Sequence, residues 1–549
     1  MRKKFVLPAV LAAIGALLLV ASAFAGVSRS TGTTGKVAKK GGTLRVNVSN
    51  GDFTFSDPGL AYDTLSWSML YTTQMLLVNF PEKSGQAGGE LYPEAATAFP
   101  IISKDGKTYT FTIRPGLKFS DGSPLTAAAF QRAIERNLSP KMGSPVGVNV
   151  QVQKLIVGGE DFLAGKTQKI AGVSAKGLKL TIKLPKPNPT FVAIMGMQWF
   201  GAVKPDTPYS TDGLNNLPSA GPYVIKSRDV GRSLVEVRNP NYKGTRPANP
   251  DQIVWTVNTD QEQTLLQVKS GQVDIDASQP PAVQYAALGQ QYGINKKQFF
   301  VGPTSCILYY ALNTTRAPFN SLAMRKAANW ALDRPALVRL SGKYSGARSD
   351  QVLVPGVPGY KRYDIYAIKG ADVAKAKKVA GGPISGTVTV FHSTSASQTA
   401  RAQVIEYNLK QIGFDTKDKP VPGGLYYKTL GTRGADFDIA YAGWCADFFD
   451  PFDYINVNLD GRSIQDANNV NFAYLNSPKL NAAMDQAASL SGAARVAAYQ
   501  KLDLTIMRDY APWVSYINLN SVYFVAPRVS NFIYSSYFTS PDYNALAVG

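Results

Sequence analysis

The chain alternates short segments of strand periodicity with segments of helix periodicity along most of its length. Residues 43–48 alternate apolar and polar side chains, as a strand with one buried face does. Similar runs occupy residues 108–113, 178–184, 253–257, 386–391 and 437–440. Helical periodicity separates them, for example at residues 125–138, 323–340, 403–412 and 480–490. This mixture predicts an α/β protein.

The length of the chain indicates more than one folded unit. Its 549 residues are too many for one hydrophobic core, so we expect two or three lobes. Glycine occurs 48 times and proline 34 times, often side by side, which indicates many tight turns between short elements. The sequence has no repeat of fixed period and no heptad run, which excludes solenoids and coiled coils.

The first 25 residues have the form of an export signal. Three basic residues precede an apolar stretch that ends in Ala23-Phe24-Ala25, a small-x-small site that signal peptidase accepts. The stretch is about long enough to span a bilayer, so an uncleaved anchor is the alternative. A lipoprotein signal needs a cysteine directly after the cleavage site, and the only cysteines are Cys306 and Cys445. We expect an exported, periplasmic or cell-surface protein that is not a lipoprotein.

The chain is strongly basic, with a formal charge of +20, of which the signal contributes three positive charges. Residues 26–42 are small, polar and basic, and they predict a disordered leader. Lysine and arginine are scattered through the chain, and an exported protein seldom meets nucleic acid. We therefore expect no nucleic-acid partner. A solvated basic surface, drawn to anionic lipid or cell wall, is the favoured interpretation.

The residue types argue against an enzyme. The single histidine, His392, has no Gly-x-Ser-x-Gly motif beside it, which disfavours a catalytic triad. One histidine and two cysteines cannot supply the four ligands of a zinc site of the Cys and His type. Chemistry that uses carboxylates alone stays open, because acids are plentiful and no pair stands out. We expect no catalytic residue, metal or cofactor.

One segment resembles a phosphate-binding loop without matching it. Five residues separate Gly159 from Gly165, where the loop that wraps a phosphate has four. An exported protein also finds little ATP. We predict a surface turn at residues 159–167.

Aromatic and acidic side chains gather in residues 444–454. Rings supply apolar walls and π faces, and a carboxylate among them would be poorly solvated and would favour a cationic partner. The alternative is a core strand that runs into a helix, with Asp450 as the N-cap and Pro451 in the first turn. Both interpretations can hold together, with Asp447 in a pocket and Asp450 capping the helix.

Several motifs occur in one order that is similar to a known family. The most specific are residues 91–96 and the run Ser-Lys-Asp-Gly-Lys-Thr-Tyr-Thr-Phe-Thr-Ile-Arg-Pro-Gly-Leu-Lys-Phe-Ser-Asp-Gly-Ser-Pro-Leu-Thr-Ala at 103–127. Further motifs follow at residues 220–223, 238–242, 271–274, 312–314, 318–319 and 324–334. The chain resembles the solute-binding proteins of ABC importers that include oligopeptide-, dipeptide- and nickel-binding receptors. The oligopeptide-binding members are the most similar.

The resemblance implies a two-lobed, periplasmic-binding-protein-like (Venus flytrap) α/β fold with an extra inserted domain. Ligand would be enclosed when the lobes close. Lobe I would comprise residues 43–77, 201–303 and 522–549. The inserted domain II would comprise residues 78–200, and lobe II residues 304–521.

The resemblance also implies a ligand site around the end of one strand. Asp447 matches the aspartate that holds the α-ammonium group of a peptide, and Cys306 and Cys445 match a pair that forms a disulfide. Tyr441 stands where such receptors can have an arginine for the peptide's C-terminal carboxylate, which leaves the preferred peptide length open. The remaining residues that we expect to contact ligand are Trp444, Phe448 and Arg433.

The sequence therefore predicts a monomeric, non-catalytic receptor that binds a short peptide and presents it to an ABC permease in the cytoplasmic membrane. Within the family, the alternatives are a sugar, a metal chelate or another small solute. An exported hydrolase and a surface adhesin are alternatives from other classes.

We predict cleavage after Ala25, because the basic start, apolar stretch and Ala-Phe-Ala site occur together. N-terminal sequencing of protein recovered from outside the cell would then begin at Gly26. An intact Met1 on that protein would instead establish an uncleaved anchor.

Overall fold

The computed structural model describes residues 39–145 and 152–549. The predicted signal and nearly all of the predicted leader lie outside the described residues. Within these two ranges, no helix combines the length and the apolar character that crossing a bilayer requires.

A five-stranded sheet contains the first predicted strand at its interior. Its order is β11 (Ile275–Asp276), β1 (Thr43–Val48), β10 (Gln252–Val257), β9 (Ser233–Arg238) and β8 (Tyr223–Asp229). β1 runs parallel to β10 and β11, so the N-terminal segment is hydrogen-bonded on both edges. The helices next to it in sequence are α1 (Thr64–Thr73), α7 (Gln261–Lys269) and α8 (Tyr285–Tyr292).

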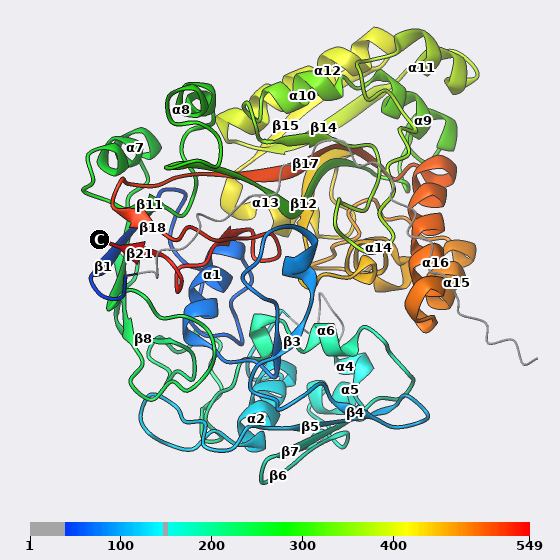
Figure 1. The fold of residues 1–549 in the computed structure, drawn as a ribbon. Helices are drawn as coiled ribbons and strands as arrows, with labels where there is room; N and C mark the ends of the chain where they lie inside the picture. The colour runs from blue at the N-terminus through cyan, green and yellow to red at the C-terminus, as the bar shows by residue number, and fades with distance from the viewer. Residues whose placement is uncertain (1–38, 146–151) are drawn as a thin grey trace, which may run out of the picture.

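A six-stranded sheet forms the second large unit (Figure 1). Its order is β13 (Gly346–Arg348), β17 (Trp513–Phe524), β12 (Phe299–Leu312), β16 (Ile439–Cys445), β14 (Thr387–Ser393) and β15 (Asp415–Val421). The helices α9 (Leu322–Ala331), α10 (Arg334–Arg339), α11 (Val373–Ala380) and α12 (Ala396–Ile412) cover one face. The helices α13 (Gly423–Leu430), α14 (Pro451–Leu459), α15 (Pro478–Ser489) and α16 (Gly492–Thr505) cover the other.

The long strands β12 and β17 connect the two large units. They pair antiparallel from Phe299 opposite Phe524 to Ala311 opposite Trp513. The register shifts between Pro303 and Ile307 and again between Leu308 and Tyr309, so the ladder is irregular at two points. Figure 1 shows both strands running from the region of β11 into the six-stranded sheet.

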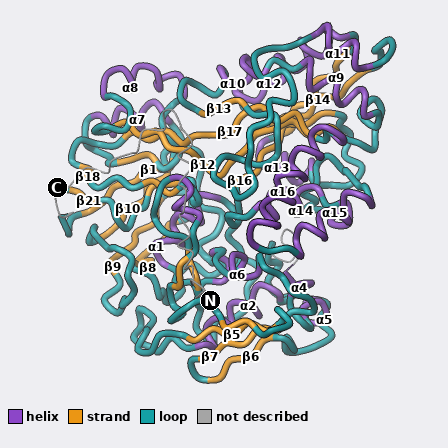
Figure 2. Tube along the Cα trace, turned by 45° about the vertical axis from the view of Figure 1, so that its right-hand side comes forward, coloured by secondary structure: helices purple, strands orange, loops and turns teal. Residues whose placement is uncertain are grey.

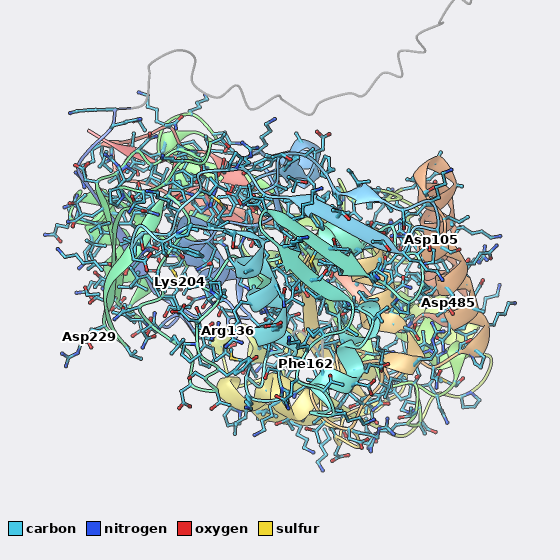
Figure 3. All side chains as sticks on the ribbon, turned by 90° about the horizontal axis from the view of Figure 1, so that it is seen from below. Asp105, Arg136, Phe162, Lys204, Asp229 and Asp485 are labelled. Carbon is cyan, nitrogen blue, oxygen red and sulfur yellow. A yellow bond between two sulfur atoms is a disulfide. The ribbon has the colours of Figure 1, made fainter. Side chains whose placement is uncertain are left out.

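A smaller four-stranded sheet lies apart from the six-stranded one (Figure 2). Its order is β4 (Ile101–Ile102), β5 (Thr108–Thr112), β7 (Lys179–Lys183) and β6 (Val173–Lys176). The helices of this region are α2 (Ala127–Leu138), α4 (Val152–Leu155), α5 (Gly159–Leu163) and α6 (Phe191–Ile194). Arg136 of α2, labelled in Figure 3, forms a buried ion pair of 2.8 Å with Asp57 ahead of α1. This pair fixes α2 to the N-terminal part of the chain.

Short two-stranded pairings complete the fold. They join β2 (Val78–Asn79) to β3 (Tyr92–Pro93), β18 (Val529–Ser530) to β21 (Ala547–Val548), and β19 (Tyr534–Ser535) to β20 (Ser540–Pro541).

The buried apolar side chains form three clusters. The first contains residues from 44–299 and 522–548 together with Phe448, and it includes both the five- and the four-stranded sheets. The second and third lie on opposite faces of the six-stranded sheet and draw on residues 307–517. Each large sheet therefore buries apolar surface of its own.

The predicted strands and most predicted helices are confirmed, but the helix predicted at residues 323–340 is two helices. α9 ends at Ala331, and α10 begins at Arg334. The Asp333 carboxylate accepts a 3.1 Å hydrogen bond from the backbone N–H of Ala336, and proline stands in the first turn of α10. An N-cap and a proline start a new helix at this point.

The surface turn predicted at residues 159–167 is also wrong in part. Residues Gly159–Leu163 form the short helix α5, which follows α4. Phe162 is buried, and Gly158 has the positive φ of 77° that precedes this helix. The buried Phe162 side chain stabilises a short helix in a segment where the sequence predicted a surface turn.

Cys306 of β12 and Cys445 of β16 lie directly opposite each other and form a disulfide. The bond joins residues that are 139 apart in sequence, across two neighbouring strands of the six-stranded sheet.

We predict that replacing both cysteines with serine lowers the free energy of unfolding by roughly 5 kcal/mol, because a long closed loop restricts the unfolded chain. Denaturant unfolding of the double variant and the wild type measures this difference. Thiol labelling of the denatured wild type is the control. If both cysteines label without reduction, the bond is not present in the protein.

Candidate functional site

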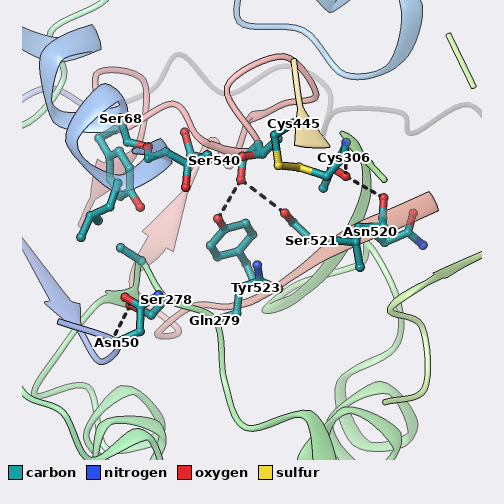
Figure 4. A pocket seen from close by; sticks show the side chains of 17 residues that line it. Asn50, Ser68, Ser278, Gln279, Cys306, Cys445, Asn520, Ser521, Tyr523 and Ser540 are labelled. Carbon is teal, nitrogen blue, oxygen red and sulfur yellow. Dashed lines mark hydrogen bonds between the residues drawn. A yellow bond between two sulfur atoms is a disulfide. The ribbon is translucent and has the colours of Figure 1, made fainter. Parts of the chain in front are cut away.

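A cavity of about 220 Å³ lies beside the disulfide, at the junction of the two large units (Figure 4). The side chains that line it are uncharged and mostly carry hydroxyl or amide groups. They are Asn50, Thr64, Leu65, Ser68, Ala277, Ser278, Gln279, Thr304, Cys306, Cys445, Leu519, Asn520, Ser521, Tyr523, Thr539, Ser540 and Tyr543. The cavity therefore offers many hydrogen-bond donors and acceptors without a net charge.

Hydrogen bonds within the wall fix several of these groups. The Ser278 hydroxyl donates to the Asn50 side chain at 2.6 Å, and the Tyr523 hydroxyl donates to the Thr539 carbonyl at 3.1 Å. Figure 4 shows these contacts around the cavity. A wall of fixed polar groups can bind the amides of an extended chain, whatever side chains that chain carries.

Asp447 lies two residues beyond Cys445, and its side chain is 5% exposed. One oxygen of the Asp447 carboxylate accepts a 2.9 Å hydrogen bond from the Tyr62 hydroxyl. The backbone carbonyl oxygen of Asp447 accepts a hydrogen bond from the Tyr537 hydroxyl. Tyr62 precedes α1 and Tyr537 follows β19, so both partners belong to chain segments of the first apolar cluster. Asp447 therefore connects the two large units.

The charge of Asp447 is poorly compensated. Within the described residues, no lysine or arginine nitrogen lies within 4.0 Å of its carboxylate. Burial raises the pKa of Asp447 to about 7, although the hydrogen bond from Tyr62 acts in the opposite direction. Burial also raises the pKa of the neighbouring Asp453 well above its usual range, and the charge of Asp447 raises it further. A cation at this position would stabilise the ionised form.

Two tryptophan rings pack against Tyr62, the hydrogen-bond partner of Asp447. The Tyr62 ring lies 4.7 Å from the Trp199 ring and 6.2 Å from the Trp67 ring, measured between centroids. Such rings exclude water and present π faces to a cation.

Trp444 and Phe448 are placed differently from Asp447. The Trp444 indole N–H donates to Asp453 at 2.9 Å, and its ring packs in the second apolar cluster. Phe448 is fully buried in the first cluster. Neither lines the cavity beside the disulfide.

Tyr441 and Arg433 precede Cys445 in the chain, and neither lines the cavity. Tyr441 is half-buried on β16, and its ring meets the Tyr310 ring edge-on. Arg433 is exposed and forms a 3.0 Å ion pair with Asp466. Among the predicted site residues, Cys306 and Cys445 line the cavity and Asp447 follows Cys445 by two residues. Like Asp447, the other predicted site residues do not line it.

The predicted cap of α14 is confirmed. The Asp450 carboxylate accepts a 2.8 Å hydrogen bond from the backbone N–H of Phe452, and Pro451 opens the helix. Arg495 donates to Asp450 at 2.6 Å and to the Thr190 hydroxyl at 2.8 Å. Asp450 thus caps the helix, while Arg495 joins it to Thr190 at the start of α6.

Sequence reasoning missed Tyr62, Tyr537 and Asp453. Tyr62 is one of 28 tyrosines and stands 385 residues before its partner, so local pattern gives no signal for it. Asp453 lies within the aromatic and acidic segment that the sequence did single out.

His392 occupies a structural position. Its Nε2 lies 2.7 Å from an Asp418 oxygen, and its Nδ1 lies 2.7 Å from the Ser393 carbonyl oxygen. Across the described ranges, no three histidine, cysteine or acidic side chains gather as a metal site would need.

The sequence model of one protein family matches residues 90–466. The family is described as bacterial extracellular solute-binding proteins, family 5 (middle region). The chain belongs to this family. Among curated relatives, a probable D,D-dipeptide-binding periplasmic protein of Escherichia coli is 27% identical over 73% of this chain and 74% of its own length. The oligopeptide-binding protein OppA of Bacillus subtilis is 25% identical over 81% of this chain and 82% of its own length.

Solved structures of other binding proteins share the fold. The clavulanic acid biosynthesis oligopeptide-binding protein 2 superposes with a TM-score of 0.85 at 22% identity, covering 93% of this chain and 96% of that one. The OppA of Haemophilus influenzae, solved in complex with the peptide RPPGFSPFR, gives a TM-score of 0.71 at 21% identity, covering 93% and 99%. The predicted two-lobed α/β fold is confirmed.

We predict that Asp447→Asn stabilises the ligand-free family 5 chain at pH 8 but not at pH 4. The carboxyl ionises near pH 4 in the unfolded chain and near pH 7 when folded, so the wild type loses stability across that interval. The asparagine variant avoids this loss, which amounts to at most about 4 kcal/mol. Thermal unfolding of both proteins from pH 4 to 8 measures it, and parallel curves would contradict the burial of this charge.

Proposed function

We propose that this chain is the extracytoplasmic receptor of an ABC importer, that it binds short peptides between its lobes, and that it presents them to a membrane permease. The observation that carries the proposal is the buried carboxylate of Asp447, which has no cationic partner among the described residues and follows, by two residues, Cys445 in the wall of an uncharged polar cavity. A buried charge is tolerated only with a partner, and a peptide's α-ammonium group is such a partner.

The cavity wall suits the rest of a peptide. A receptor that accepts many sequences must direct its hydrogen bonds to the peptide backbone and termini, which are common to all peptides. The hydroxyl and amide groups around the disulfide provide such bonds without selecting for side-chain charge.

The names of several relatives agree with a peptide ligand, and the names of others point to a different small solute. Two relatives above are named for dipeptides and oligopeptides, and one solved relative holds a nine-residue peptide. Other family members are named for heme and for glutathione. A sugar or a metal chelate remains the second candidate, but a neutral sugar would leave Asp447 without a cation.

The organisation that follows from this proposal has two lobes around the cavity. Residues 43–77, 201–303 and 522–549 form lobe I, residues 304–521 form lobe II, and residues 78–200 form the inserted domain. The protein acts outside the cytoplasm, without a lipid anchor, as a non-catalytic monomer.

We predict that Asp447→Asn weakens peptide binding by at least roughly thirtyfold, because removing one member of a buried charge pair costs about 2–5 kcal/mol. An acetylated peptide should lose similar affinity on the wild type. Isothermal titration with matched free and acetylated peptides measures both. Asp466→Asn is the matched control, because this exposed acid has Arg433 as its one ion-pair partner in the described ranges, and the variant should bind as the wild type does.

The outcome that contradicts the proposal is equal binding of free and acetylated peptides. Binding of a sugar or a metal chelate in the absence of any peptide binding would assign the protein to the second candidate.

A further inference from the structure

The four-stranded sheet has one covered face and one open face. Tyr109, Phe111, Leu180 and Ile182 point to the covered face and are at most 2% exposed. The helix α2 packs against β6 and β7 on this side. Figure 1 shows β6 and β7 at the lower margin of the molecule with α2 above them, so the opposite face of the sheet borders solvent.

The open face is basic. It carries three exposed lysines on neighbouring strands, Lys176 of β6 and Lys179 and Lys183 of β7. The residues of β5 opposite Lys179 and Lys183 are Thr112 and Thr108, so β5 adds no carboxylate to this face. Among the described residues, no carboxylate oxygen lies within 4.0 Å of any of the three ammonium groups. These three positive charges therefore have no ion-pair partner in this part of the chain.

Two of the lysines stand directly opposite each other. Lys176 and Lys179 form the last cross-strand pair before the two-residue turn at residues 177–178. Like charges in this position destabilise a pair of strands. The sheet gains nothing from the pairing, whereas an anionic partner outside the protein would stabilise both charges.

The sequence around the open face is poor in acids. Residues 162–205 contain seven lysines and no aspartate or glutamate. The hairpin of β4 and β5 adds Lys104 and Lys107 together with one acid, Asp105, which accepts hydrogen bonds from the Ser103 hydroxyl and the Lys107 backbone N–H. The sheet therefore carries an excess of positive charge, which attracts an anionic surface over about one Debye length.

Apolar side chains lie exposed beside the lysines. Ile101 of β4 is 76% exposed, and the cross-strand register places it in one row with Thr110 and Thr181. Thr181 is the residue between the two lysines of β7 on the same face, so Ile101 shares the open face with them. Phe99, two residues before Ile101, is 49% exposed. Exposed apolar groups within a basic face are typical of surfaces that enter the boundary between lipid headgroups and acyl chains.

We infer that the open face, with Lys176, Lys179, Lys183, Ile101 and Phe99, docks on the anionic headgroup surface of a phospholipid bilayer. A second copy of this chain would bring like charges together, and a hydrated anionic polymer would leave the two apolar side chains in water. A bilayer accommodates both the charges and the apolar groups. The inference goes beyond the proposed function and does not depend on which solute the cavity binds.

The test is sedimentation of the exported protein with vesicles of phosphatidylcholine alone, or of phosphatidylcholine and phosphatidylglycerol in equal parts. The wild type should bind the anionic vesicles and not the neutral ones. Raising the salt concentration from about 0.1 M to about 0.5 M should weaken this binding, because the Debye length shortens.

Replacing the three lysines together, as Lys176→Gln, Lys179→Gln and Lys183→Gln, should weaken binding to anionic vesicles by at least about thirtyfold, since each lysine near such a surface contributes about fivefold. Ile101→Ser should weaken it by at least about threefold, also at the higher salt concentration, because salt does not screen apolar insertion. The thermal unfolding midpoint of the lysine variant should be unchanged or raised, because the opposed charges are gone.

The matched control removes the same charge from the other end of the molecule. Lys377→Gln, Lys378→Gln and Lys410→Gln together replace three exposed lysines of α11 and α12, which Figure 1 shows at the upper margin. This variant should bind anionic vesicles as the wild type does.

Four results overturn the assignment. Absence of binding to anionic vesicles refutes it outright. Equal weakening by the two triple variants shows a diffuse effect of net charge rather than a docking face. Binding that ignores Ile101→Ser, together with tighter binding to a soluble glycerol-phosphate polymer, assigns the face to a cell-wall polyanion. Sedimentation without vesicles that Ile101→Ser abolishes assigns it to a second copy of the chain.

Discussion

The antiparallel ladder between β12 and β17 is the constraint on which the other features depend. It carries the chain between the two large units twice, so their relative position is set by hydrogen bonds rather than by a flexible linker. On its other edge β12 pairs with β16, which places Cys306 opposite Cys445 and brings the end of β16 beside the junction. Because β16 ends there, the residues that follow it, including Asp447, emerge between the two units.

Burial of charge follows two patterns in this protein. Arg136 with Asp57 and Arg246 with Glu94 are buried ion pairs that hold chain segments together. Asp447 and Arg401 are each buried without an ion-pair partner in the described chain. Leaving a single charge buried destabilises a fold, so positions of this kind are expected where a ligand completes the pair.

The sequence predicted the pattern of strands and helices because both depend on local periodicity and on caps such as Asp450. The break between α9 and α10 was predictable in principle, since Asp333 and the following proline signal a helix start, but the apolar periodicity on either side concealed it. Alternation along β16 explains why Trp444 points into the core while Tyr441 and Cys445 share the opposite face. Contacts such as Tyr62 with Asp447, and the burial of Arg401, depend on segments far apart in sequence and have no local signature.

The first of the two register shifts between β12 and β17 lies at Pro303 to Ile307, next to the disulfide and in the floor of the cavity. Rotation of one unit against the other bends most easily where ladder hydrogen bonds are missing. Displacement grows with distance from the pivot, so such a rotation moves the floor little and the rim most. Under the proposed function, a ligand on this floor would therefore meet nearly the same wall in the open and the closed form, and contacts at the rim would differ between the two forms.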